Sequence, residues 1–146
     1  MNYLLDTCVL SEFTRRRPNV AIIDWLQSID EQKCFLSVIT IGEIRRGIEK
    51  LPESQRKNEL FVWLNEALMN RFTTRILIVD TQTMLVWGAL TARLESAGKK
   101  MSTMDAFIAA SALQHNMALV TRNVSDFSSC GLQILDPWEV TNGSGK

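Results

Sequence analysis

Acidic and amide side chains recur just after short apolar runs in this chain, which is a placement suited to metal-assisted hydrolysis. The residues in question are Asp6, Glu43, Asp105, Asn123 and Asp126. Carboxylates that converge on one edge of a sheet repel one another unless cations neutralise them. Hard oxygen ligands, without a thiolate pair or a second histidine, favour Mg²⁺ or Mn²⁺ over Zn²⁺. A divalent ion held in this way lowers the pKa of a bound water and stabilises charge on a phosphoryl oxygen.

Other catalytic chemistries lack the residues that they need. The single histidine, His115, is expected in a structural role on a buried helix, and no G-x-S-x-G elbow supports a serine triad. The glycine fingerprint of dinucleotide-binding folds and the phosphate-binding P-loop are both absent. Cys8, Cys34 and Cys130 are odd in number and far apart, which disfavours a disulfide framework and a zinc site and fits a reducing cytoplasm.

Each acid, taken singly, also has a structural interpretation. Asp105 has the spacing of a capping box and could simply cap a helix, although a capped carboxylate can also bind metal. Asp6 could end a strand in a turn, and Glu43 could lie on a solvated helix face. Asp80 and Asp136 are interpreted as turn or cap residues only.

Short apolar runs alternate with stretches of helical period, which predicts an α/β domain with a largely parallel sheet. Strands are expected at 3–5, 34–36, 76–79, 117–120 and 133–135, with the β-branched run 76–79 in the centre. Helices are expected over 20–29, beginning at Pro18, and over 41–51, 60–72, 84–94 and 106–113. Because ligands of parallel sheets bind beyond the carboxyl ends of the strands, the acids are expected to meet there.

The composition indicates one domain. With 146 residues, of which 46% are apolar, the chain is long enough to bury a core of its own. We expect this domain over 1–140 and a polar tail over 141–146. We expect neither export nor a membrane span, because the sequence shows no leader segment and no run of 18 apolar residues. The 16 basic and 16 acidic residues cancel, so any polyanion must be met by a local arrangement of charge.

Four segments of the chain carry a family resemblance by their order and spacing. They read LLDTCVLSE (4–12), LSVITIGEIRRG (36–47), DAFIAA (105–110) and LVTRNVSDF (119–127). Together they resemble the PIN domain, and within it the VapC and FitB-like toxins of bacterial type II toxin–antitoxin pairs. The resemblance implies a three-layer α/β/α fold with about five strands and a Mg²⁺- or Mn²⁺-dependent endoribonuclease. It also implies a homodimer that a small antitoxin inhibits, in a larger complex that binds operator DNA through the antitoxin.

The resemblance assigns roles residue by residue. The family's metal-binding carboxylates fall on Asp6, Glu43 and Asp105. A fourth acid often follows the family's Thr-Arg pair, but here Asn123 holds that place and Asp126 is the nearest carboxylate. One of these two is expected to orient the attacking water. Because of this departure from the family pattern, the resemblance supports a first metal ion more strongly than a second one.

Basic residues near these positions are expected to meet phosphate. Arg45, Arg46 and Arg122 are the predicted RNA contacts, and the run 15–17 is either a further contact or a solvated loop. The four tryptophans are expected in the core or at a dimer contact rather than under RNA bases.

Two other functions stay open. A haloacid-dehalogenase-like phosphatase also begins with a strand ending in Asp, but it needs a second Asp where this chain has Cys8. A catalytically degenerate PIN domain that only binds RNA or a partner is suggested by Asn123. One bound Mg²⁺ would shift the formal charge from zero to +2, so RNA affinity is expected to depend on metal as well as on salt.

Overall fold

In the computed structural model, which describes residues 1–139, five parallel strands form a single central sheet. They are β1 (Tyr3–Leu5), β2 (Cys34–Ser37), β3 (Ile76–Leu77), β4 (Ala118–Val120) and β5 (Ile134–Leu135). Their order across the sheet is β3-β2-β1-β4-β5, so the chain adds strands outward from β1 in one direction and then in the other. The order reverses between β1 and β4, where open α/β sheets bind their ligands.

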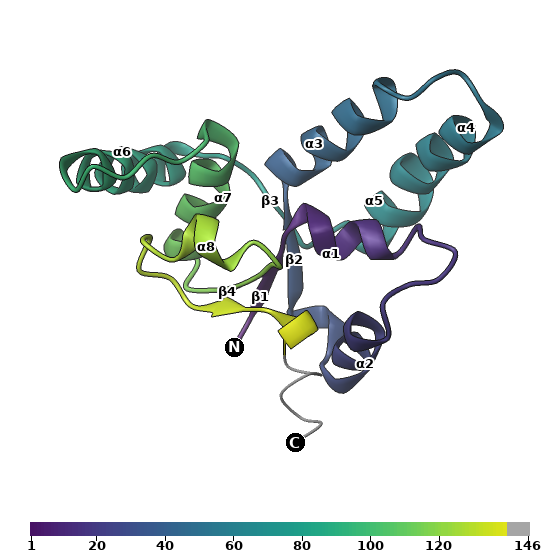
Figure 1. The fold of residues 1–146 in the computed structure, drawn as a ribbon, viewed down its shortest axis with the longest axis horizontal. Helices are drawn as coiled ribbons and strands as arrows, with labels where there is room; N and C mark the ends of the chain where they lie inside the picture. Colours follow the sequence, from purple (N-terminus) through teal and green to yellow (C-terminus); the bar gives the residue numbers. More distant parts are fainter. Residues whose placement is uncertain (140–146) are drawn as a thin grey trace.

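Helices cover both faces of the sheet and complete the predicted three-layer α/β/α architecture (Figure 1). One side carries α1 (Thr7–Glu12), α2 (Val20–Ser28), α3 (Val38–Glu49), α4 (Gln55–Val62) and α5 (Met69–Arg71). The other carries α6 (Thr81–Ser96), α7 (Thr103–Gln114) and α8 (Val124–Phe127). A 3-10 turn, η1 (Glu31–Lys33), precedes β2, and a π-helical segment, η2 (Trp63–Leu68), joins α4 to α5. The tail predicted over 141–146 lies outside the described residues.

Alternate residues of the strands pack into two apolar cores, one on each face of the sheet. Leu5, Leu36 and Val120 pack on the side of α1 to α5. Leu4 and Leu119 pack on the side of α6 to α8. Successive side chains of a strand point to opposite faces, and both faces of this sheet are covered. The strands are therefore continuous apolar runs in the sequence.

Three expectations about individual elements are wrong. The run 76–79 contains only the short strand β3, which lies at the edge of the sheet and leaves Ile78 63% exposed. Its β-branched residues indicate a strand but do not fix its place in the sheet. Asn19 rather than Pro18 begins α2, because the Asn19 side chain accepts a backbone N–H of the first turn at 2.8 Å. His115 lies at the exposed C-terminal end of α7 and not within its buried part.

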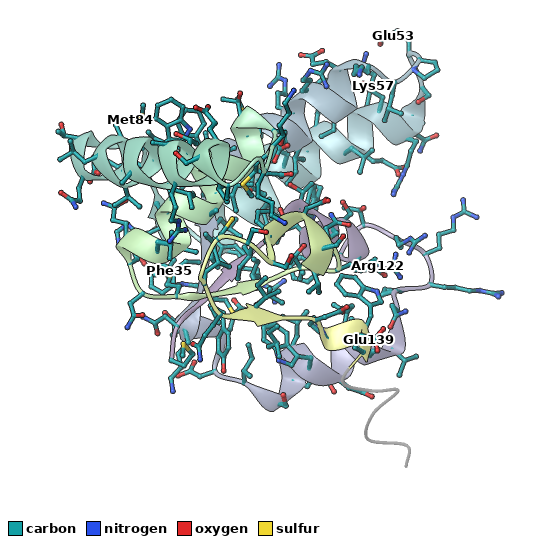
Figure 2. The ribbon with its side chains drawn as sticks, turned by 60° about the vertical axis from the view of Figure 1, so that its left-hand side comes forward. Phe35, Glu53, Lys57, Met84, Arg122 and Glu139 are labelled. Carbon is teal, nitrogen blue, oxygen red and sulfur yellow. The ribbon has the colours of Figure 1, made fainter. Side chains whose placement is uncertain are left out.

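A buried lysine holds the outer end of α3, the helix that carries Glu43. Lys57 Nζ donates to the carbonyl oxygens of Glu49 at 3.3 Å and Leu51 at 3.0 Å, and to Glu53 Oε1 at 3.0 Å. Figure 2 shows Glu53 and Lys57 at this end of the molecule. A cation suits the C-terminal carbonyls of a helix. The contact therefore fixes α3 from the end opposite to the sheet.

A buried arginine beside the edge strand β3 also donates to backbone carbonyl oxygens, as Lys57 does at the end of α3. Arg75, 6% exposed, donates through Nη1 to the carbonyl oxygens of Cys34 at 2.6 Å and Glu31 at 2.7 Å. Its Nη2 donates to the carbonyl oxygen of Arg71 at 2.7 Å and lies 3.5 Å from the Glu31 carboxylate. The guanidinium therefore ties the segment before β3 to the start of β2.

We predict that Arg75→Met lowers the free energy of unfolding by about 3–5 kcal/mol, because buried acceptors and a carboxylate lose their donor. Urea denaturation measures this loss. The exposed ion pair of Arg45 with Glu49 provides the matched control, and Arg45→Gln should cost less than about 1 kcal/mol. Equal losses in the two variants would contradict the assigned role of Arg75.

Candidate active site

Asp6 lies at the carboxyl end of the central strand β1, and hydrogen bonds fix both of its carboxylate oxygens. Oδ1 accepts the N–H of Thr7 at 2.8 Å, and Oδ2 accepts the hydroxyl of Thr121 at 2.8 Å. The Thr121 hydroxyl accepts in turn the N–H of Asn123 at 3.0 Å. Because Asp6 is only 5% exposed, these bonds hold the carboxylate in one orientation between β1 and β4.

Glu43 and Asp105 reach the same edge of the sheet from two helices. The hydroxyl of Ser37, at the end of β2, caps α3 and so sets the direction of the helix that carries Glu43. Glu43 Oε1 accepts the hydroxyl of Thr7 at 3.3 Å. Asp105 lies in the first turn of α7, where its N–H donates to the hydroxyl of Ser102 at 3.2 Å. Ser102 therefore caps α7, whereas Asp105, which its spacing allowed as a capping residue, takes part in this cap through its N–H.

Burial and mutual repulsion raise the pKa of all three carboxyl groups. Burial is the largest cause for Asp6, Glu43 and Asp105 alike, and the hydrogen bonds described above offset only part of it. The charge of Asp6 further raises the pKa of the other two, and the charge of Asp126 raises the pKa of Asp6 and Asp105. No basic side chain among residues 1–139 contributes to lowering the pKa of any of the three. None of the three carboxylates forms an ion pair in that part of the chain.

The two candidates for the fourth position differ in their surroundings. Asn123 precedes α8, and its exposed side chain makes no capping hydrogen bond. Asp126 lies within α8, and its charge acts on both Asp6 and Asp105. The fold therefore brings the four predicted carboxyl groups into one electrostatic cluster, and Asn123 is linked to it through its backbone N–H, which donates to Thr121.

The chemistry of this donor set fits Mg²⁺ or Mn²⁺, because carboxylate oxygens are the ligands that these hard cations prefer. The carboxyl groups stand apart from one another rather than around a single point. Within residues 1–139, no three His, Cys, Asp or Glu side chains lie close enough to hold one metal ion as placed. Without a cation the carboxylates repel one another, so their separation is expected in the metal-free protein. It does not argue against a site that closes around a cation.

Hollows flank the carboxyl cluster on both sides. One, of about 640 Å³, is lined by Glu43 together with Arg46 and Lys50. A smaller one, of about 210 Å³, extends from Glu43 toward α4 and η2. A cleft of about 420 Å³ is lined by Asp105 and Asp126. The site is therefore open to a long ligand rather than enclosed around a small one.

The three predicted arginine contacts separate in space. Arg46 lines the hollow beside Glu43. Arg45 instead pairs with Glu49 at 2.9 Å, on the exposed side of α3. Arg122, which Figure 2 labels, lies over the ring of Trp138 at 4.7 Å. It lines a different hollow of about 620 Å³.

Several residues at the site were not predicted from the sequence. Thr7 and Thr121 contact the carboxylates directly, and their signal would have been a hydroxyl residue just after a strand end. Lys50 lies one helical turn beyond Arg46 and lines the same hollow, so helical spacing could have identified it. Lys99 and Lys100 line the cleft beside Asp105, but they lie between α6 and α7, where no periodic pattern reveals them.

Comparison with known proteins agrees with this geometry. The PIN domain family matches residues 3–129. The plasmid stability protein StbB of Pseudomonas syringae pv. tomato is 38% identical over 93% of this chain and 98% of its own length. Toxin FitB of Neisseria gonorrhoeae is 33% identical over 92% of this chain and 97% of its own. VapC ribonuclease Y4jK of Sinorhizobium fredii is 31% identical over 93% and 97%.

Solved structures show the same fold. The crystal structure of FitAcB from Neisseria gonorrhoeae matches with a TM-score of 0.87 and 32% identity, over 93% of this chain and 98% of that one. VapBC-1 from nontypeable Haemophilus influenzae matches with a TM-score of 0.75 and 27% identity, over 94% and 99%. These matches overturn the haloacid-dehalogenase-like alternative. By its sequence and its fold, the chain belongs to the PIN domain family.

Proposed function

We propose that this chain is the toxin of a toxin–antitoxin pair and an endoribonuclease that hydrolyses RNA with Mg²⁺ or Mn²⁺ held by Asp6, Glu43 and Asp105. The observation that carries the proposal is the carboxyl cluster at the strand ends, where Thr7 bonds to both Asp6 and Glu43 and Asp105 lies in the first turn of α7. Within residues 1–139 these acids form no ion pair, and burial raises their pKa. When bound, such a cation supplies Lewis-acid stabilisation and lowers the pKa of a water. The names of the relatives, toxin FitB and VapC ribonuclease, support it.

The residues of this cluster have different proposed roles. Asp6 is the fixed member, because it is buried and both of its oxygens accept hydrogen bonds. Glu43 and Asp105 are less buried and can turn toward it. We assign the fourth position to Asp126, whose charge already acts on Asp6 and Asp105, and leave Asn123 as a hydrogen-bond partner for water.

RNA is held by local positive charge, since the chain has no net charge to attract it. Arg46 and Lys50 line the hollow beside Glu43, where a guanidinium can bind a phosphate through two parallel hydrogen bonds. Arg45 faces Glu49 instead and has no part in this contact.

The proposed partners are a small cognate antitoxin and a second copy of the chain. Relatives with solved structures are described as FitAB and VapBC complexes, one of them FitAB bound to a DNA fragment, which supports an antitoxin that contacts operator DNA. Ile78, Met84 and Leu85 are exposed apolar side chains in or just before the first turns of α6, and their burial in a homodimer would be favourable (Figure 2 labels Met84).

The free thiols of Cys8, Cys34 and Cys130 fit a reducing compartment, so we propose that the protein acts in the cytoplasm. No helix within residues 1–139 is long and apolar enough to span a membrane.

Asp105→Asn should stabilise the metal-free protein, raising Tm at pH 7 by about 1–3 °C, because it removes one of the repelling charges. A raised carboxyl pKa means that the folded state keeps protons that the unfolded chain has released. Wild-type stability should therefore fall as pH rises from about 4 through the raised native pKa values, and the variant should lose less. Thermal melts in EDTA measure both effects, with the exposed acid variant Glu66→Gln as control.

With Mg²⁺ or Mn²⁺ added, the wild type should have a higher Tm than Asp105→Asn, because a cation stabilises the wild-type cluster more than a cluster that lacks one carboxylate. A wild-type Tm that responds to neither ion, even when each is present in large excess over the protein, would contradict the cation site.

The purified protein should cleave single-stranded RNA with Mg²⁺ or Mn²⁺ and not with EDTA. Asp6→Asn should lower kcat by about 100-fold or more. Asp126→Asn should lower kcat about tenfold more than Asn123→Ala does, because the charge at 126 acts on the cluster. Cleavage that survives EDTA or Asp6→Asn would contradict the proposal. RNA that binds but is not cut with either metal would instead identify a degenerate, binding-only PIN domain.

Arg46→Gln should raise KM for RNA by about tenfold, because a charge-assisted hydrogen bond to phosphate is lost. Arg45→Gln, one residue away on the same helix, should leave KM nearly unchanged. Steady-state cleavage of a fluorescent RNA measures both values. An equal effect of the two substitutions would mean that α3 contributes only general charge.

A further inference from the structure

The cleft beside Asp105 has features that metal binding does not explain. It lies between the α6–α7 connection and α8, with a volume of about 420 Å³, and we call it the α8 cleft. Asp105 and Asp126 line it, so it adjoins the carboxyl cluster. Its volume is within the range of sites that bind small organic ligands.

The α8 cleft has a small apolar floor within a mainly polar lining. The half-buried Met101 is its accessible part, because Leu94, 5% exposed, and Cys130, 1% exposed, offer little surface to a ligand. Cys130 Sγ contacts Met101 Sδ at 3.6 Å, and Arg93 Nη2 donates to the carbonyl oxygen of Cys130 at 2.9 Å. The floor is therefore fixed from both sides. Sulfur atoms are polarisable and contact aromatic rings favourably.

The rim of the α8 cleft is polar and has hydrogen-bonding groups to spare. Ser128 donates to the carbonyl oxygen of Ser125 at 3.1 Å, whereas the exposed hydroxyls of Ser125 and Ser129 make no hydrogen bond within residues 1–139. Lys99 and Lys100 are exposed on the same rim, and neither forms an ion pair in that part of the chain. The cleft thus combines an apolar floor, free hydroxyls and two lysines that form no direct ion pair, with Asp105 and Asp126 on the side toward the carboxyl cluster.

We infer that the α8 cleft holds one unpaired nucleotide of the RNA, next to the phosphodiester bond that is cut. The base packs on Met101, the accessible part of the floor, and the serine hydroxyls contact its edge. The lysines hold the adjoining phosphate, which the charges of Asp105 and Asp126 would otherwise repel. The inference rests on the proposed function and deepens it by naming the residues that select the nucleotide beside the cut.

The shape of the cleft selects single-stranded RNA. A base can reach an apolar floor only when it is unstacked and unpaired, which is how proteins read loops, bulges and strand ends. The groups at the rim then distinguish one base from another by their hydrogen-bonding edges. The cleft therefore determines which nucleotide lies beside the cleavage position.

The first test maps cleavage sites in a pool of random-sequence single-stranded RNA, with full-length protein and Mg²⁺ or Mn²⁺. Wild type should prefer one base beside the cut and should cleave the same sequences in a duplex far more slowly. Ser129→Phe, which fills the cleft, should lower cleavage at preferred sites by about tenfold and abolish the preference. Ser96→Phe, on the exposed surface of α6, is the matched control and should change neither.

Lys100→Gln should raise KM for the same RNA with the base preference retained, while Lys33→Gln, in η1 before β2, should not. Circular dichroism verifies the fold of each variant. If Ser129→Phe cleaves with the wild-type rate and preference, the inference is wrong and the ribonuclease function stands.

The second test needs no catalysis. The four nucleoside monophosphates are titrated in EDTA into ¹⁵N-labelled wild-type protein. At least one should shift the amide signals of 99–102 and 125–130, and Ser129→Phe should abolish these shifts. No shift there with any of the four overturns the inference. Such shifts from a protein that cuts no RNA with either metal would retain the nucleotide site and overturn the ribonuclease function.

Discussion

The parallel pairing of β1 with β2 on one side and β4 on the other is the constraint on which the rest of the site depends. Leu5 lies opposite Val120, and the N–H of Asp6 continues this ladder by donating to the Val120 carbonyl at 3.0 Å. Asp6 and Thr121 are therefore neighbours, and their side chains bond directly. A shift of one residue in this register would turn the Asp6 carboxylate toward an apolar core.

The same pairing concentrates negative charge where the sheet ends. Asp6, Glu43 and Asp105 each have a raised pKa, so the folded protein without a cation is less stable at neutral pH than it would be with amides in their place. Apolar cores on both faces of the sheet provide the stability that tolerates this cluster. The zero net charge of the chain thus conceals a local acidic site with basic residues, among them Arg46, Lys50 and Lys100, on the hollows around it.

Local patterns in the sequence were sufficient to predict where most strands end and where α7 begins. Apolar runs followed by acids located the strand ends, and the capping-box spacing before Asp105 located the start of α7. Contacts between distant parts of the chain could not be predicted in this way. The bond from Thr121 to Asp6 joins residues 115 positions apart, and the edge position of β3 depends on sheet order rather than on composition.

Side-chain direction was the other feature that the sequence left open. Arg45 and Arg46 are adjacent on α3, yet one pairs with Glu49 and the other lines the hollow beside Glu43. Neighbours on a helix point about 100° apart, and only the packing of the helix decides which of them reaches the site. Lys99 and Lys100 lie in a connection whose path depends on tertiary packing.

We propose that the carboxyl ends of β1 and β2 and the start of α7 together form a site for a divalent cation. Anomalous X-ray diffraction from crystals grown with Mn²⁺ is the sharpest test of this site, because it locates the ion without reference to activity. We expect an anomalous peak bounded by the carboxylates of Asp6, Glu43 and Asp105. Saturating Mn²⁺ that gives no peak there, or a peak only at unrelated surface carboxylates, would contradict it.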